Sequence, residues 1–118
     1  MSPRPSSVLI LDDADVPPVI QAGDGVVVHR AHGILQAGAL LANERPNWLV
    51  VNPKCAWHRR VLAVIPREAR PAVIGVGDAW GDDIDARWLP SSPLAAVLER
   101  ARQERLRRAT PPEYATAA

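Results

Sequence analysis

The chain has 118 residues, of which 47% are hydrophobic and 23% are charged. This length suits one domain with a single buried core, and the composition lies well away from that of disordered chains. The formal net charge of +1 excludes a strong general attraction to nucleic acid or to an anionic membrane.

The single cysteine, Cys55, excludes an internal disulfide and fits a reducing compartment. No apolar run approaches the roughly 20 residues that span a bilayer, and residues 1–7 lack the layout of a signal peptide. We therefore expect a cytoplasmic protein that binds neither a membrane nor nucleic acid directly. Residues 1–7 are expected to be a flexible N-terminus, residues 8–109 the domain, and residues 110–118 a tail or linker.

The first part of the chain predicts two strands with little helix between them. Residues 8–11 are wholly apolar and stop at two aspartates, which is typical of a parallel strand buried on both faces. Prolines and glycines interrupt residues 14–25, so a helix there is predicted to be short or absent. Residues 26–28 are valines and predict a second strand, with its polar end at His29.

Two helical patterns surround a third strand. Apolar residues recur at helical spacing over residues 33–45, and Pro46 ends that pattern. Residues 48–51 are an apolar run and predict the third strand. A second helix is predicted over residues 58–69, with its regular part ended early by Pro66.

The last part of the chain predicts two strands and a long helix. Residues 73–76 and 87–89 are the expected strands, and the short segment between them leaves room for a turn at most in place of a fourth helix. The final helix is predicted after Ser91 and Ser92, which are plausible N-caps. Because its apolar stripe becomes basic, we expect this helix to leave the core near residue 102.

Strands that alternate with helices predict an α/β fold, a doubly wound parallel five-stranded sheet with helices on both faces. In such folds the functional site lies at the carboxyl ends of the strands. Four loops are therefore candidates, namely residues 12–15, 29–33, 52–58 and 77–85.

Four segments of the chain resemble the receiver domain of bacterial response regulators, in the same order. They are Val8-Leu-Ile-Leu-Asp-Asp13, Arg45-Pro-Asn-Trp-Leu-Val-Val-Asn52, Pro71-Ala-Val-Ile-Gly-Val-Gly77, and Gly81-Asp-Asp-Ile followed by Leu89-Pro90. The resemblance covers residues 8–108. It implies a flavodoxin-like, receiver-like three-layer sandwich, here with shortened first and fourth helices.

The resemblance also implies a degenerate phosphorylation pocket. The family holds Mg²⁺ with an acidic pair, here Asp12 and Asp13, and with a phosphoryl-accepting aspartate whose position is taken by Asn52. An amide is a poor nucleophile and carries no charge for a hard cation. We expect no cofactor and no metal site, although a retained cation at Asp12 and Asp13 stays an alternative to their being plain loop or capping residues.

Two further parts of the family's pocket are replaced. The hydroxyl that closes strand four falls on Gly77, or on Val76 if the register slips by one. The lysine before the family's proline after strand five is replaced by Leu89. The chain therefore resembles a pseudo-receiver that lacks the parts needed to accept and read a phosphoryl group.

The remaining polar candidates favour ordinary roles. His29, His32 and His58 match no metal-ligand spacing, so solvated loop histidines are the favoured interpretation. Cys55 lies near His58 in sequence, but a partly buried, inert thiol is favoured over a reactive one.

The tryptophans predict an interface. Trp48 is expected in the core, whereas Trp57, Trp80 and Trp88 map near loops where the shortened fourth helix uncovers the sheet. Exposed apolar surface of this kind usually marks a binding face. The predicted interface residues are Trp80, Trp88, Leu94, Leu98 and Arg105.

Two functional hypotheses follow. The first is a non-enzymatic, phosphorylation-independent signalling and protein-interaction module that regulates a fused or separate output domain and possesses a face for homodimerisation. The second is a small-ligand sensor that uses the vacated phosphorylation pocket. A degraded phosphotransfer enzyme is the least favoured reading.

Overall fold

A five-stranded, all-parallel sheet with the order β2-β1-β3-β4-β5 forms the centre of the molecule in the computed structural model. This confirms the predicted α/β class. The structure describes residues 6–16, 20, 22–66, 69–77, 84–89 and 91–109. The strands are β1 (Ser6–Leu11), β2 (Val26–Ala31), β3 (Trp48–Val51), β4 (Ala72–Val76) and β5 (Ala86–Trp88).

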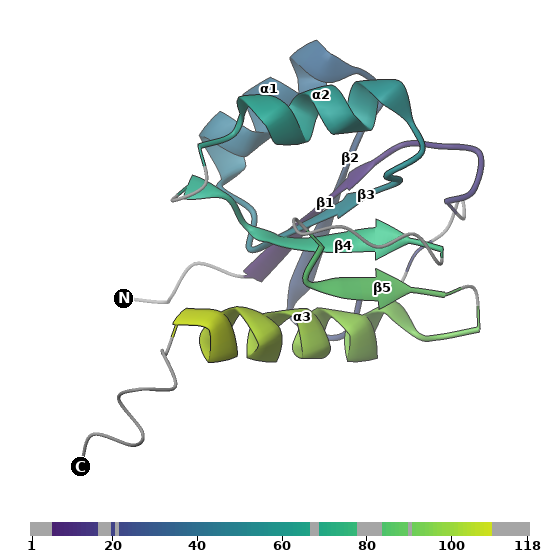
Figure 1. Cartoon of the computed structure of the whole chain (residues 1–118), viewed down its shortest axis with the longest axis vertical. Helices are drawn as coiled ribbons and strands as arrows, with labels where there is room; N and C mark the ends of the chain where they lie inside the picture. Colours follow the sequence, from purple (N-terminus) through teal and green to yellow (C-terminus); the bar gives the residue numbers. More distant parts are fainter. Residues whose placement is uncertain are drawn as a thin grey trace.

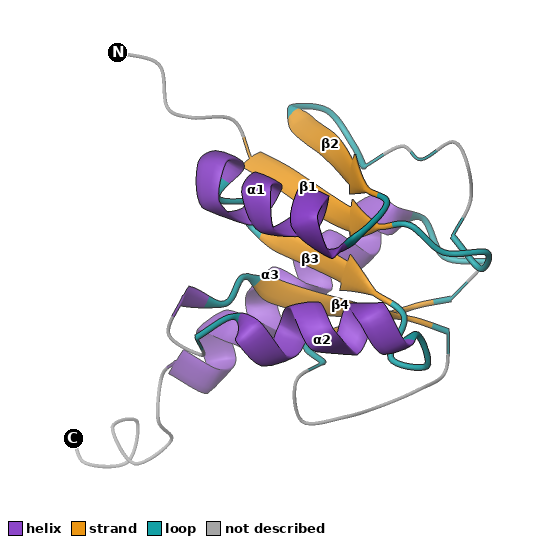
Figure 2. Ribbon diagram, turned by 90° about the horizontal axis from the view of Figure 1, so that it is seen from above, coloured by secondary structure: helices purple, strands orange, loops and turns teal. Residues whose placement is uncertain are grey.

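Helices cover both faces of the sheet, as a doubly wound fold requires (Figure 1). The helices are α1 (Ile34–Glu44), α2 (Ala56–Val64) and α3 (Leu94–Ala109). Figure 2 shows α1 and α2 side by side over one face, with α3 behind the sheet. The result is the expected flavodoxin-like, three-layer arrangement. Within the described residues no helix is both long and apolar enough to cross a membrane.

Two apolar clusters, one on each face, stabilise these layers because the strand side chains alternate between the faces. Leu9 and Leu11 point into the cluster beneath α1 and α2, whereas Val8 and Ile10 point into the cluster beneath α3. All four side chains are fully buried. The apolar run of β1 therefore reflects a strand that is covered on both sides.

Three strands are longer than their patterns predicted, among them β4, which begins at Ala72 rather than at Val73. β1 begins at Ser6 rather than at Val8, and β2 continues to Ala31. His29 and Arg30 therefore lie within a strand and not in a loop, because they pair with Leu9 and Ile10 of β1. A prediction based on apolar runs misses the end of this strand, because polar residues occupy it.

At the residues that the structure describes, the crossover segments agree in part with their predictions. α2 begins at Ala56, two residues earlier than predicted, and it ends before Pro66, as expected. Residues 12–16 and 22–25 contain no helix, although residues 17–19 and 21 lie outside the description. The predicted reduction of the fourth helix falls on residues 78–83, which also lie outside it.

The last helix leaves the apolar core after Ala101, close to the predicted residue 102, but its polar contacts with the rest of the domain continue. Arg105 donates hydrogen bonds to the backbone carbonyls of Arg70 and Pro71 at 2.6 and 3.1 Å. Arg108 donates to the carboxylate of Asp85 at 3.0 Å. The basic residues thus continue the contact between α3 and the sheet after the apolar stripe has ended.

Candidate functional site

The predicted site residues follow the ends of parallel strands, so they share one edge of the sheet. Asp12 follows β1, Asn52 follows β3, Gly77 follows β4 and Leu89 follows β5. We call this edge the carboxyl rim. Hydrogen bonds join Asn52 to Asp13 directly and to the backbone of Asp12 through His58. The backbone N–H of Gly77 donates to the carbonyl of Trp88 at 3.0 Å.

The Asn52 side chain is the centre of this network and is only 7% exposed. Its Nδ2 donates to Asp13 Oδ2 at 2.8 Å and to Asp15 Oδ2 at 3.4 Å. Its Oδ1 accepts the backbone N–H of Lys54 at 3.0 Å. These partners fix the orientation of the amide, because the carboxylates need a donor and the backbone N–H needs an acceptor.

Asp12 is engaged on both oxygens by cationic or potentially cationic side chains. Arg30 donates from Nη2 to Oδ1, and the His32 ring nitrogen Nδ1 lies 2.9 Å from Oδ2. The hydrogen bond from Arg30, followed by the one from His32, holds the pKa of Asp12 below its usual value. The hydrogen bond from Asn52 likewise lowers the pKa of Asp13.

His58 is fully buried, which corrects the interpretation of a solvated loop histidine. Its Nδ1 accepts the backbone N–H of Asn52 at 2.8 Å, and its Nε2 lies 2.9 Å from the carbonyl oxygen of Asp12, to which it must donate. This pair of bonds selects the neutral tautomer with the proton on Nε2. Burial lowers the pKa of His58, which also favours the neutral ring.

A cluster of Asp13, Cys55 and His58 has the proximity of a metal site, with its ligand atoms within 4.8 Å of one another. The hydrogen bonds argue against that use. The Nδ1 lone pair of His58 already accepts a backbone N–H, and Nε2 carries the proton. A metal ion would have to displace one of these bonds, so the trio as arranged offers only two free ligands.

The rim also fits Mg²⁺ poorly. Asn52 presents its NH₂ group, and not its oxygen, toward Asp13. Hard cations are bound by oxygen atoms, and Asp12 is already neutralised by Arg30. The amide hydrogens thus hold the carboxylates together, a role that a bound cation fills in acidic sites.

Gly77 and Leu89 add no polar group to the rim. Gly77 has a φ of 85°, a conformation that side chains with a Cβ rarely adopt. The backbone turn after β4 thus explains why glycine stands where the resemblance predicts a hydroxyl. The Leu89 side chain is 39% exposed.

The predicted interface residues lie mostly inside the molecule. Trp88, Leu94 and Leu98 are buried in the cluster beneath α3, and Arg105 bonds to backbone carbonyls. Trp48 is buried as predicted, with its Nε1 donating to Leu98 O at 2.9 Å. These residues therefore stabilise the fold, and the three buried side chains offer little surface to a partner.

Two of the tryptophans need separate mention. Trp57 is half-buried and its ring meets that of His58 edge to face, with 4.3 Å between centroids. Trp80 lies outside the described residues.

Several contacts of the network were not predicted from the sequence. Arg30 and His58 lie 18 and 46 positions from Asp12, and no local spacing relates them to it. Asp85 was assigned to a loop, yet its side chain is 2% exposed and pairs with Arg108. Its position directly before an apolar strand is the only local signal.

No protein-family model matches this chain, and no curated protein matches it significantly. The fold and the rim therefore define only the structural class of this protein. It is an α/β domain of flavodoxin-like architecture whose rim carboxylates are bonded to donors of the same chain.

Proposed function

We propose that this chain is a phosphorylation-independent protein-interaction module that resembles a response regulator receiver domain and regulates a fused or separate output domain. The single observation that carries the proposal is the Asn52 side chain. Its amide occupies the end of β3 and donates to Asp13 and Asp15. An amide at this place supplies neither the nucleophile of an acyl phosphate nor an anionic metal ligand.

The rest of the rim supports the same proposal. Asp12 is paired with Arg30, so the acid beside the expected nucleophile is not open to a cation. His58 uses both ring nitrogens in hydrogen bonds to backbone atoms and has no free lone pair for general base chemistry. What remains for function is the outer surface of the domain.

The small-ligand alternative gains no support from the rim. A vacated pocket needs polar groups that await a ligand, whereas the Asn52 amide and both Asp12 oxygens already have partners within the chain. A metabolite that raises the melting temperature in proportion to the logarithm of its concentration would favour this alternative.

Intact mass after incubation with a small acyl phosphate and Mg²⁺ tests the proposal. We expect the mass to stay unchanged. A phosphoryl adduct that disappears in Asn52→Ala or Asp13→Asn variants would contradict the proposal, because it would place phosphoryl chemistry at the rim. An adduct that persists in both variants would arise elsewhere on the chain, which would equally contradict a phosphorylation-independent module.

A further inference from the structure

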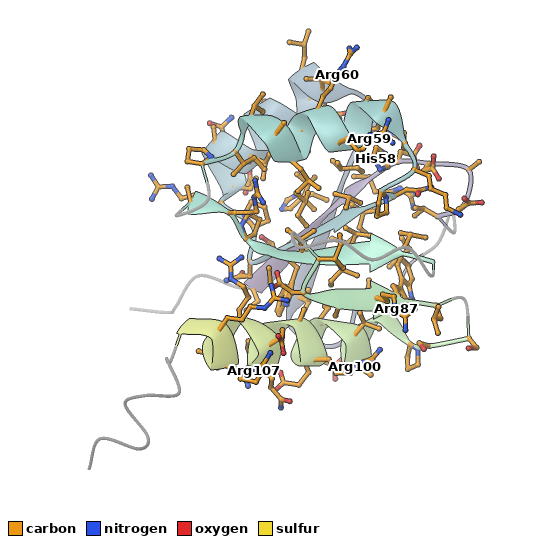
Figure 3. The ribbon with its side chains drawn as sticks, in the orientation of Figure 1. His58, Arg59, Arg60, Arg87, Arg100 and Arg107 are labelled. Carbon is orange, nitrogen blue, oxygen red and sulfur yellow. The ribbon has the colours of Figure 1, made fainter. Side chains whose placement is uncertain are left out.

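A groove of about 440 Å³ lies between the edge strand β5 and helix α3. Its walls include Ala86, Arg87 and Leu89 from β5 and the residues after it, and Arg100, Gln103 and Arg107 from α3. Figure 3 shows Arg87, Arg100 and Arg107 on this side of the molecule, and shows Arg59 and Arg60 on α2, across the sheet.

Two acids, Asp85 and Glu104, also line the groove, and both already have partners in the chain. Asp85 accepts a hydrogen bond from Arg108, and Glu104 pairs with Arg107 at 2.6 Å. The hydrogen bond from Arg107 lowers the pKa of Glu104 to about 2, so this carboxylate stays ionised and occupied. The local acids therefore do not neutralise the whole groove.

Arg100 has no acidic partner among the described residues that line the groove. Its one hydrogen bond runs from Nη2 to the carbonyl of Arg87 at 3.5 Å, and no carboxylate in the described part of the chain pairs with it. Arg107 is exposed, and exposed ion pairs of its kind with Glu104 contribute little to stability. Arg107 can therefore turn toward an incoming carboxylate at small cost, because Glu104 keeps its pairing with Arg108 at 3.0 Å.

The spacing of these two arginines suits an extended chain. Arg100 and Arg107 lie seven positions apart on one helix, which corresponds to about 10 Å along the axis. A segment in the extended polyproline II conformation covers that span with about three residues, and its side chains return to the same face at every third residue. Carboxylates at positions one and four of such a segment would each reach one guanidinium group.

We propose that the groove between β5 and α3 binds an acidic, extended segment of a protein partner through Arg100 and Arg107. This inference rests on the proposed function, because it assigns the partner chemistry of that interaction module. The charge distribution favours an acidic peptide over nucleic acid. The chain has a net charge of only +1, and Asp85 and Glu104 interrupt the positive surface that a phosphate backbone would follow.

Fluorescence anisotropy with a labelled peptide containing Glu-Ser-Ser-Glu tests the inference. The peptide is titrated with the full chain, and a peptide with glutamine in place of glutamate is the ligand control. We expect binding that weakens with added salt, and a loss of about tenfold or more in Arg100→Glu.

Arg60→Glu is the matched protein control. Arg60 is an exposed arginine on α2, so the substitution makes the same change in net charge on the opposite face. We expect it to weaken binding by less than about twofold. Thermal melts of both variants ensure that a loss of affinity does not reflect a loss of folding.

Three results would overturn the inference. They are equal effects of the two charge reversals, equal binding of the glutamine peptide, and tighter binding of single-stranded DNA than of the acidic peptide. Dimerisation in sedimentation that Arg100→Glu abolishes would assign the groove to a second copy instead. None of these results alters the intact-mass test of the rim. The groove proposal can therefore fail while the proposed function stands, and the two failures are distinguishable.

Discussion

Asn52 donates its side-chain amide to the carboxylate of Asp13 at 2.8 Å, and this bond ties the end of β3 to the end of β1. The partners lie 39 positions apart in sequence. The bond shows why an amide suits this position: it supplies hydrogens where two carboxylates converge, and an acid would supply a third negative charge.

Asn52→Asp is expected to destabilise the fold and to create dependence on Mg²⁺. The new carboxylate faces Asp13 and Asp15 and loses both donated hydrogen bonds, which costs about 1–3 kcal/mol of unfolding free energy. Thermal melts with Mg²⁺ or with a chelator measure both effects. Melting of the wild-type chain should not change with Mg²⁺.

The matched control for that change is Asn47→Asp. Asn47 accepts the backbone N–H of Ser7 through Oδ1 at 3.0 Å, and an aspartate keeps this acceptor. We expect a small effect on melting and none from Mg²⁺. An Mg²⁺ response in the control equal to that of Asn52→Asp would show that the response is not specific to the rim.

Acid is expected to weaken the fold through His58. Burial lowers the folded-state pKa of this ring below the ordinary value of about 6.5, so the unfolded chain binds the proton more readily. Stability is therefore full above about pH 7 and falls as the pH drops below about 6.5. Asp12 and Asp13 have lowered pKa values and stay ionised in this window.

Urea unfolding at several pH values between about 7.5 and 5.5 measures this slope. His58→Gln should be less stable than the wild type at neutral pH, with a flatter dependence on pH. An unchanged slope in His58→Gln would assign the pH dependence to other groups.

Asp85→Ala is expected to loosen α3 from the sheet. Asp85 accepts the backbone N–H of Val73 at 2.8 Å and pairs with Arg108, and its side chain is 2% exposed. Its removal leaves a buried N–H without an acceptor, and we expect a loss of about 2–3 kcal/mol of unfolding free energy. Chemical denaturation measures the loss.

Glu99→Gln serves as the comparison for Asp85→Ala. Glu99 pairs with Arg102 on the exposed surface of α3, where water screens the interaction. We expect almost no change in the denaturation midpoint. Equal effects of the two substitutions would mean that burial does not make the interactions of Asp85 more stabilising than those of an exposed acid.

Two glycine substitutions are expected to act in opposite directions. Gly77→Ala places a Cβ at a φ of 85° and should cost about 1 kcal/mol. Gly38→Ala lies in α1 with no atom within 4 Å of the new Cβ, and should stabilise the fold by about 0.5–1 kcal/mol. Melting temperatures of the pair give the signs, and a gain at Gly77 would contradict the backbone argument.

Local patterns were sufficient for most of the fold. The third strand, residues 48–51, was predicted with the bounds that it has, because it is an apolar run between polar residues. The order of strands and helices followed from the change between extended and helical patterns. Errors occurred where polar side chains occupy regular elements, as His29 and Arg30 do in β2.

The composition of the rim could also be predicted, since residues that follow parallel strands meet at one edge. The sequence alone placed Asp12, Asp13 and Asn52 at that edge, where Asn52 donates to Asp13 and is linked to the backbone of Asp12 through His58. It also showed that the residue after β3 carries an amide, so no folded arrangement can place a carboxylate of this residue at the rim.

Only the folded chain decided which donor meets which acceptor. The register of β1 and β2 brings Arg30 to Asp12, and the packing of α2 over the end of β1 places His58 beneath that rim. The same holds for Asp85, whose arginine partner comes from the far end of α3. Hydrogen bonds act over about 3 Å in space, and a parallel sheet brings together residues that are remote in the chain, so no local spacing encodes them.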